Sequence, residues 1–234
     1  MARVAGLLAV GVLAAAAPPA ASNGLSLGPG GELERLPTHQ KVVALTFDGG
    51  SDAGGAAAIV RTLERKHATA TFFLTGMWAR RYPKLARRIG ARFPVGDHTY
   101  DHADLTRMSS ADVRRDILRG TYWLRAIARR NPRPLFRFPY GARDSRTLAI
   151  VRRLGYVSVR WSLDTWGWMG TTEGQSVASV VARVASRLRR GDVILLHLGA
   201  GRDGSMLDAR ALPRVIDLIR HRGYRFVGLG RYLR

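Results

Sequence analysis

The chain has 234 residues, of which 46% are hydrophobic, and this is enough for one globular domain with a sizeable core. It contains no cysteine, which excludes a disulfide framework and a thiolate metal site, so any metal must bind imidazole, carboxylate or water. Lys and Arg number 38 against 17 Asp and Glu, and the net charge of +21 favours polyanionic surroundings, although solvated helix faces explain the arginine excess equally well.

The first predicted element is an export signal. Arg3 precedes an uninterrupted run of small apolar residues at 4–17, Pro18 ends the run, and small residues before Ser22 offer a cleavage site. We therefore expect residues 1–22 to be a signal peptide and the protein to be secreted or associated with the cell wall. The run is shorter than the roughly 20 residues of a membrane span, and a retained anchor is the alternative.

Residues 23–40 are rich in Gly, Pro and polar residues and are expected to form a linker before a single domain at 41–234. In that domain, β-rich runs alternate with helical patterns, which predicts a parallel sheet. The expected strands are 42–47, 70–74, 93–96, 135–138, 156–162, 193–197 and 225–229. The expected helices are 56–66, 83–91, 111–130, 146–154, 177–190 and 209–222. About seven such repeats in one domain favour a (β/α) barrel over an open doubly wound sheet. We expect a monomer.

Helix start and stop signals support these boundaries. Ser109 followed by Asp112 is typical of a capping-box start. Gly155, Gly191 and Gly223 each follow the last turn of a predicted helix, as left-handed C-terminal caps do.

Polar residues follow several of the predicted strands, and in a parallel barrel such positions converge on one face. His98 and His102 are spaced so that two imidazoles can share a metal, although such a pair is also common on surfaces. Asp48 ends the apolar run 42–47 and is a candidate general base, or a cap of the following glycine turn. Asp52 is a candidate carboxylate ligand or a helix cap.

The later strand ends add further candidates. His197 follows an apolar run and is either a general acid or a hydrogen-bonded core residue. Arg137 can hold a carboxylate through paired hydrogen bonds, or form a surface ion pair. Tyr140, Trp166 and Trp168 lie near these groups in sequence and are either packing residues or the lining of a sugar or acyl pocket.

The order of these motifs matches a known pattern. Thr-Phe-Asp at 46–48 is followed by His-Thr-x-x-His at 98–102, Arg-x-Pro-Tyr at 137–140, Asp-x-x-x-Trp at 164–168 and Leu-Leu-His at 195–197. Over residues 42–197 the chain resembles the polysaccharide deacetylases, carbohydrate esterase family four. The resemblance implies a distorted (β/α) barrel. It also implies removal of N- or O-acetyl groups from a polysaccharide such as peptidoglycan, a chitin-like polymer or acetylxylan.

The resemblance also implies the main catalytic roles. His98 and His102 would bind a divalent metal, with zinc expected and cobalt, manganese or nickel as alternatives. Asp48 would act as the base that activates the metal-bound water. His197 would protonate the departing amine or alkoxide.

Four further residues receive supporting roles from the resemblance. Arg137 would orient the base, and the backbone N–H of Tyr140 would stabilise the oxyanion together with the metal. Leu195 and Leu196 would help to shape the acetyl pocket.

Two positions depart from the pattern of the family. Gly49 stands where a second Asp usually supplies the carboxylate ligand, and we expect Asp52 to reach the metal instead. Gly167 stands where an Asp usually tunes the catalytic His, and we expect Asp164 to do so.

Three functions are compatible with these residues. The first is a secreted, metal-dependent polysaccharide deacetylase. The second is a non-catalytic module that binds cell-wall glycan and has lost the metal. The third is a basic protein that binds nucleic acid or anionic lipid, although no nucleic-acid motif accompanies the arginines. We expect the deacetylase, with a glycan substrate, no nucleic-acid partner and an electrostatic attraction to acidic cell-wall polymers.

Overall fold

The computed structural model describes residues 31–233; the predicted signal peptide and residues 23–30 of the predicted linker lie outside this part. The strands are β1 (Glu32–Leu33), β2 (Val42–Gly49), β3 (Ala70–Leu74), β4 (Val95–Asp97), β5 (Leu135–Phe136), β6 (Val157–Val159), β7 (Leu163–Asp164), β8 (Val193–His197) and β9 (Arg225–Phe226). The helices are α1 (Ala56–Arg65), α2 (Gly76–Arg81), α3 (Pro83–Arg92), α4 (Ser110–Trp123), α5 (Ser145–Arg153), α6 (Val177–Arg187) and α7 (Leu207–His221).

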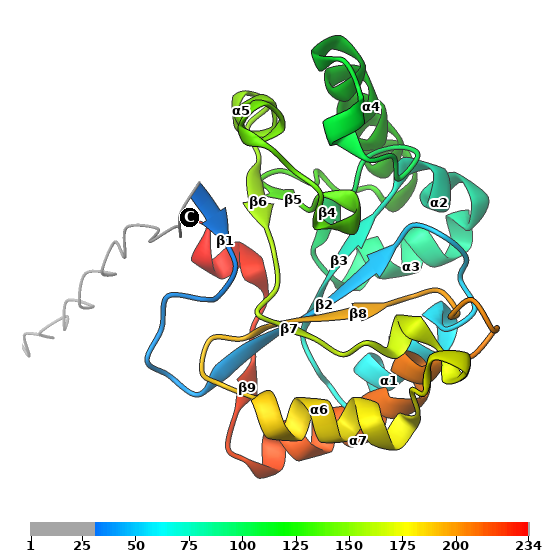
Figure 1. Cartoon of the computed structure of the whole chain (residues 1–234), viewed down its shortest axis with the longest axis vertical. Coiled ribbons are helices and arrows are strands. Elements are labelled where there is room, and N and C mark those ends of the chain that lie inside the picture. The colour runs from blue at the N-terminus through cyan, green and yellow to red at the C-terminus, as the bar shows by residue number, and fades with distance from the viewer. Residues whose placement is uncertain (1–30, 234) are drawn as a thin grey trace, which may run out of the picture.

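The strands form one curled sheet of parallel strands with the order β1-β6-β5-β4-β3-β2-β8-β7, and β9 pairs with β2 (Figure 1). β6 and β7 are separated by only three residues. β6 pairs with β5, and β7 pairs with β8, so this bent segment joins the two sides of the sheet. The predicted distorted (β/α) barrel is therefore confirmed.

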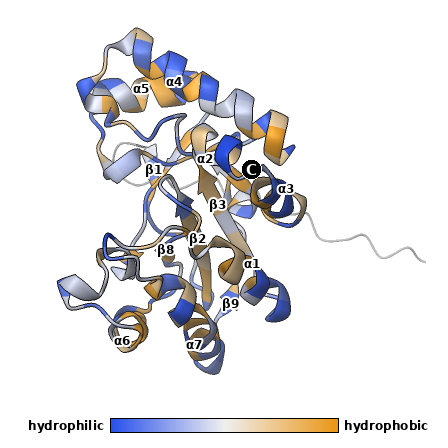
Figure 2. Ribbon diagram, turned by 90° about the vertical axis from the view of Figure 1, so that its right-hand side faces the viewer, coloured by the Kyte–Doolittle hydropathy of each residue, from blue (hydrophilic) through white to orange (hydrophobic). Residues whose placement is uncertain are grey.

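Side chains alternate between the two faces of β2, and this alternation separates two cores. Leu45 and Phe47 belong to the larger core, which packs the sheet against the surrounding helices. Val42 and Ala44 belong to a smaller core inside the barrel. The next residues on this inner face are Thr46 and Asp48, so polar groups replace apolar ones toward the end of the strand. In Figure 2 the central strands β2 and β3 are largely hydrophobic, whereas the helices around them also carry hydrophilic stretches.

The structure confirms the predicted start of one helix and the glycines predicted at the ends of three others. Ser109 caps α4, and its side chain accepts the backbone N–H of Asp112. Gly155, Gly191 and Gly223 all have φ between 76° and 79°, a left-handed conformation that glycine adopts without steric cost.

Residues 31–40 differ from the linker that composition predicted, because they contribute a strand of the sheet. Leu33 is 1% exposed and packs inside the barrel. Glu32 is buried as well, and its carboxylate accepts hydrogen bonds from Ser158 and Arg143. The domain boundary at residue 41 was therefore wrong. Within residues 31–233, no helix is both long and apolar enough to cross a bilayer.

Candidate active site

Five polar side chains come from the carboxyl ends of parallel strands, which lie at one edge of the sheet. Asp48, Asp164 and His197 lie in the last residues of β2, β7 and β8. His98 and Arg137 directly follow β4 and β5. Asp48 and His197 occupy paired positions on adjacent strands, so both point toward the same face. The sequence-predicted groups thus converge as a parallel barrel requires.

Arg137 is a fully buried guanidinium that holds Asp48. Its Nη1 donates to Asp48 Oδ1 at 2.7 Å and to Thr46 Oγ1 at 3.0 Å. Its Nε donates to the Val159 carbonyl, and its guanidinium lies 4.1 Å from the centre of the Phe73 ring. Burial alone would raise the pKa of Asp48, but the charge and hydrogen bond of Arg137, together with the neighbouring His98 and His197, hold this pKa below its ordinary value. Asp48 is therefore an oriented carboxylate at neutral pH.

His98 has one ring nitrogen without a proton, and this nitrogen faces Asp48. Its Nδ1 lies 2.7 Å from the Arg137 carbonyl oxygen, which only accepts, so Nδ1 carries the hydrogen. Burial lowers the pKa of His98, so the ring is neutral and Nε2 presents a lone pair. This Nε2 lies 3.7 Å from Asp48 Oδ2, so two acceptors face one another. Nε2 is therefore free to bind a cation, and the nearby carboxylate favours a positive charge there.

His102 supplies a second neutral imidazole. Its ring packs edge to face on His98, with 4.8 Å between ring centres, and on Tyr140, with 4.6 Å. Burial and the neighbouring His98 lower the pKa of His102 to about 3. His102 and Tyr140 have φ of 67° and 58°, and such strained backbone is frequent at functional sites. Together, His98 and His102 have the donor chemistry of a site for a divalent transition metal.

The structure does not bring Asp52 to these histidines, and the sequence-based assignment of this residue as the third ligand is not supported. Asp52 Oδ1 accepts the backbone N–H of Gly54 at 2.7 Å and that of Ala200 at 3.0 Å. Its carboxylate thus ties the loop after β2 to the loop after β8. Within residues 31–233, no three His, Cys, Asp or Glu side chains form a group able to hold a metal. The histidine pair fits a metal whose remaining ligands are water or substrate.

Replacing Asp52 by Asn is expected to leave the affinity for zinc unchanged, because the carboxylate already serves two backbone amides. The matched variant His98→Gln is expected to lower the affinity about tenfold or more, since it removes a ligand. Calorimetric titration of zinc into each purified variant measures both effects. An equal loss of affinity in the two variants would show that Asp52 moves to the metal.

His197 faces a carboxylate that the sequence analysis missed. Its Nδ1 is buried and lies 3.8 Å from Oδ2 of Asp208, in the first turn of α7. Burial alone would lower the pKa of His197, but Asp208, Asp48 and Asp164 outweigh it and raise this pKa above its ordinary value. The only sequence signal for Asp208 is an acid in a first helical turn, which is common in helices of every function.

Asp164 forms no hydrogen bond or ion pair with His197 within the described residues, and its charge contributes less to the raised pKa of this histidine than Asp208 and Asp48 do. Its Oδ1 accepts the backbone N–H of Trp166 at 2.9 Å, and its Oδ2 accepts Nε1 of Trp168 at 3.3 Å. Burial raises the pKa of Asp164. The residue therefore shapes the turn that presents two tryptophans.

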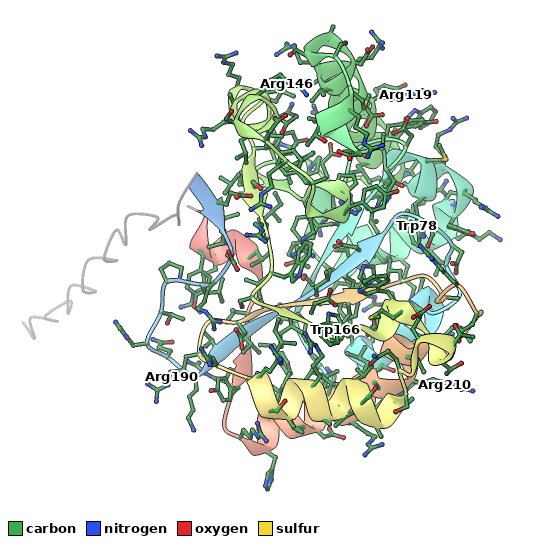
Figure 3. The ribbon with its side chains drawn as sticks, in the orientation of Figure 1. Trp78, Arg119, Arg146, Trp166, Arg190 and Arg210 are labelled. Carbon is green, nitrogen blue, oxygen red and sulfur yellow. The ribbon has the colours of Figure 1, made fainter. Side chains whose placement is uncertain are left out.

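Three exposed aromatic rings follow the strand ends that carry Arg137 and Asp164. Tyr140 is 72% exposed, Trp166 40% and Trp168 44%. Trp168 lies 6.2 Å from the His197 ring, and Figure 3 places Trp166 between β7 and α6, where the Arg183 guanidinium stacks on it. Exposed aromatic rings beside polar catalytic groups are suited to stacking on sugars.

Leu196 is not part of this lining, contrary to the sequence-based prediction. It is fully buried in the core between the sheet and the helices, because it pairs with Phe47 on the outer face of the barrel. Leu195 shares the inner face with His197, since residues two apart along a strand point the same way.

A buried hydrogen-bond network behind the histidines was also missed. Asp97 accepts hydrogen bonds from Thr121, Tyr156 and the backbone N–H of Thr99. Burial raises the pKa of Asp97 to about 7. The network fixes the end of β4, and hence the backbone position of His98.

Comparison with known sequences places these residues in a family. The chain matches the model of the family described as Polysaccharide deacetylase over residues 35–159. A chitooligosaccharide deacetylase from Azorhizobium caulinodans is 30% identical over 204 residues, which cover 83% of this chain and 95% of the relative. A peptidoglycan-N-acetylglucosamine deacetylase from Bacillus cereus is 31% identical over 202 residues, which cover 85% of this chain and 91% of the relative.

Solved structures share the fold. A peptidoglycan N-acetylglucosamine deacetylase superposes with a TM-score of 0.79 at 28% identity, covering 86% of this chain and 92% of that one. A CE4 family pseudoenzyme from Bacillus anthracis superposes with a TM-score of 0.76 at 23% identity, covering 86% of this chain and 68% of that one, and this likeness concerns the fold.

Proposed function

The chain belongs to the polysaccharide deacetylase family, and we propose that it is a metal-dependent hydrolase that removes acetyl groups from N-acetylglucosamine units of peptidoglycan or a chitin-like glycan. One observation carries the proposal. Asp48, whose carboxylate is held by the buried Arg137, and His197, whose pKa is raised, occupy paired positions on adjacent strands. A base and an acid on either side of a reacting group are what amide hydrolysis requires.

His98 and His102 would hold the metal, and Asp48 Oδ2 faces the same point. When bound, a divalent metal supplies a Lewis acid that polarises the acetyl carbonyl and lowers the pKa of water. Zinc suits two imidazole ligands, and cobalt, manganese and nickel are compatible with the same donors.

Asp48 and His197 divide the proton transfers. Asp48 accepts a proton as water attacks the acetyl carbon, because Arg137 keeps it ionised and oriented. His197 gives a proton to the amine nitrogen as the carbon–nitrogen bond breaks, and its raised pKa favours the protonated ring that this step needs. The products are acetate and a free amino sugar. The backbone N–H of Tyr140 is proposed to stabilise the oxyanion, and the three exposed aromatic rings are proposed to stack on the glycan.

We further propose that the protein acts outside the cytoplasm as a monomer. The basis is the apolar run at 4–17 after Arg3, which is typical of a signal peptide. The net charge of +21 would hold a secreted enzyme near acidic cell-wall polymers and their embedded glycan.

A second candidate function is a glycan-binding module without catalysis. The observation that favours it is that, within residues 31–233, no three His, Cys, Asp or Glu side chains form a group able to hold a metal. Such a module would bind the same oligosaccharides through the aromatic rings and release no acetate.

Acetate release distinguishes the two functions. We expect the mature chain to release acetate from N-acetylglucosamine oligomers and from peptidoglycan. Stripping with a chelator is expected to lower the rate about a hundredfold or more, and added zinc or cobalt to restore it. Acetylxylan serves as the O-acetyl comparison. Oligomer binding by a folded protein without acetate release from any substrate would instead establish the binding module.

A further inference from the structure

The side chain of Asp208 is a buried acid that neither gives nor accepts a proton in the proposed transfers. Asp208 is 3% exposed and lies in the first turn of α7. Its Oδ1 accepts a hydrogen bond from Thr165 Oγ1 at 2.7 Å, and its Oδ2 accepts the backbone N–H of His197 at 2.9 Å. Two neighbouring segments thereby fix both carboxylate oxygens.

The same carboxylate faces the ring of His197. Oδ2 lies 3.8 Å from Nδ1, which is buried and has no hydrogen-bond partner among the described residues. Within residues 31–233, Asp208 forms an ion pair with His197 and with no other side chain. A buried carboxylate whose cationic partner is an imidazole stabilises the protonated form of that ring.

Gly167 makes room for this arrangement. A Cβ built at Gly167 would lie 2.3 Å from Oδ1 and 2.6 Å from Cγ of Asp208. A side chain at position 167 would therefore occupy the same space as this carboxylate. The position of the Asp208 carboxylate therefore requires a glycine at residue 167.

Other titratable groups also face His197. Asp48 approaches from β2, where a buried guanidinium neutralises it, and Asp164 approaches from β7. His98 and His102 also interact with His197 electrostatically, but both rings are neutral because burial lowers their pKa values. Among the carboxylates, Asp208 is the one at ion-pair distance from the ring of His197.

We propose that Asp208 is the positioning residue of His197. It holds the ring with Nδ1 toward α7 and stabilises the imidazolium, so that Nε2 carries the proton for the leaving amine. The catalytic consequence rests on the proposed function, whereas the coupling between the two charges exists with or without a substrate.

The test is Asp208→Asn, examined by NMR titration of the His197 ring in the zinc-loaded full chain and by the pH dependence of kcat. The amide oxygen can still accept the His197 N–H, and the amide nitrogen can donate to Thr165, whose hydroxyl also lies 3.1 Å from the Leu195 carbonyl. We expect the pKa of His197 to fall and the alkaline limb of kcat to move to lower pH. At alkaline pH, kcat should fall about tenfold with little change in KM.

Two variants serve as comparisons. Asp217→Asn removes an exposed carboxylate from the same helix and is expected to change neither the titration nor the rate. Asp164→Asn should shift the His197 titration less than Asp208→Asn. An unmoved titration in folded Asp208→Asn, or a larger shift in Asp164→Asn, would overturn the proposal. An inactive wild type would refute the proposed function but leave the titration decisive.

The reciprocal exchange provides a second, independent measurement. Gly167→Asp alone is expected to lower kcat about tenfold or more, because its Cβ displaces the carboxylate of Asp208. Gly167→Asp combined with Asp208→Gly should return the His197 titration toward the native value. If the double variant titrates like Asp208→Asn while Gly167→Asp alone has no effect, the two positions are not linked and the proposal fails.

Discussion

Replacing Asp48 by Asn is expected to lower kcat for acetate release about a thousandfold and to leave the affinity for zinc nearly unchanged. The amide retains an oxygen for Arg137, which donates to Asp48 Oδ1 at 2.7 Å in the native chain. It cannot accept a proton from water, so general-base catalysis is lost. His98 and His102 remain in place, so metal binding should survive.

Steady-state kinetics and calorimetric zinc titration on the same preparation distinguish a general base from a metal ligand at this position. Asp112→Asn removes an exposed carboxylate at the start of α4 and is the matched control, with native kinetics expected. A loss of zinc affinity as large as the loss of rate would mean that Asp48 is a metal ligand and not the base. Native kcat would mean that another group activates the water.

Most of the barrel was predictable because buried parallel strands have a strong sequence signal. The runs at 70–74 and 193–197 coincide with β3 and β8, since both are short and mostly apolar. The glycine caps were equally predictable, because a left-handed turn at a helix end favours glycine. These features depend on local sequence alone.

The missed elements depend on distant contacts. β1 has two residues, and its pairing with Ser158 and Val159 lies far away in sequence. α2 has six residues, too few to show a helical period, although Thr75 caps it through the backbone N–H of Trp78. Short elements of this kind are stabilised by tertiary packing, not by propensity.

The candidate site was predictable in its strand-end residues and not in its partners. Spacing alone does not show that Asp52 serves backbone amides, or that Asp208 reaches back from the next helix to His197. The face of Leu196 was predictable in principle, because it is one residue from His197 and must point to the opposite side of the strand. Alternation along a strand therefore deserves more weight than proximity in sequence.

The largest expected loss of stability follows from Arg137→Met, about 3–5 kcal/mol near pH 7. Arg137 is fully buried and donates to the Val159 and Arg160 carbonyls, to Thr46 and to Asp48. Methionine fills part of the volume but leaves the carboxylate of Asp48 buried without its cation. The loss of stability should therefore exceed that caused by the lost packing alone.

The pH dependence of this loss identifies its cause. In the native chain the pKa of Asp48 is held below its ordinary value, so the pair stabilises the fold above about pH 4 and less as the pH falls. In Arg137→Met, burial raises the pKa of Asp48, so the variant loses stability as the pH rises through that pKa. Denaturant unfolding should therefore show a larger difference at about pH 7 than at about pH 4.

A double-mutant cycle separates the buried charge from the lost packing. Asp48→Asn combined with Arg137→Met is expected to be more stable than Arg137→Met alone at neutral pH, because no uncompensated charge remains. Its stability should also depend less on pH than that of the single variant. Equal losses in the single and double variants at every pH would assign the role of Arg137 to packing on Phe73 and to its carbonyl acceptors. In that case the orientation of Asp48 would have to come from the backbone of β2 and not from the guanidinium.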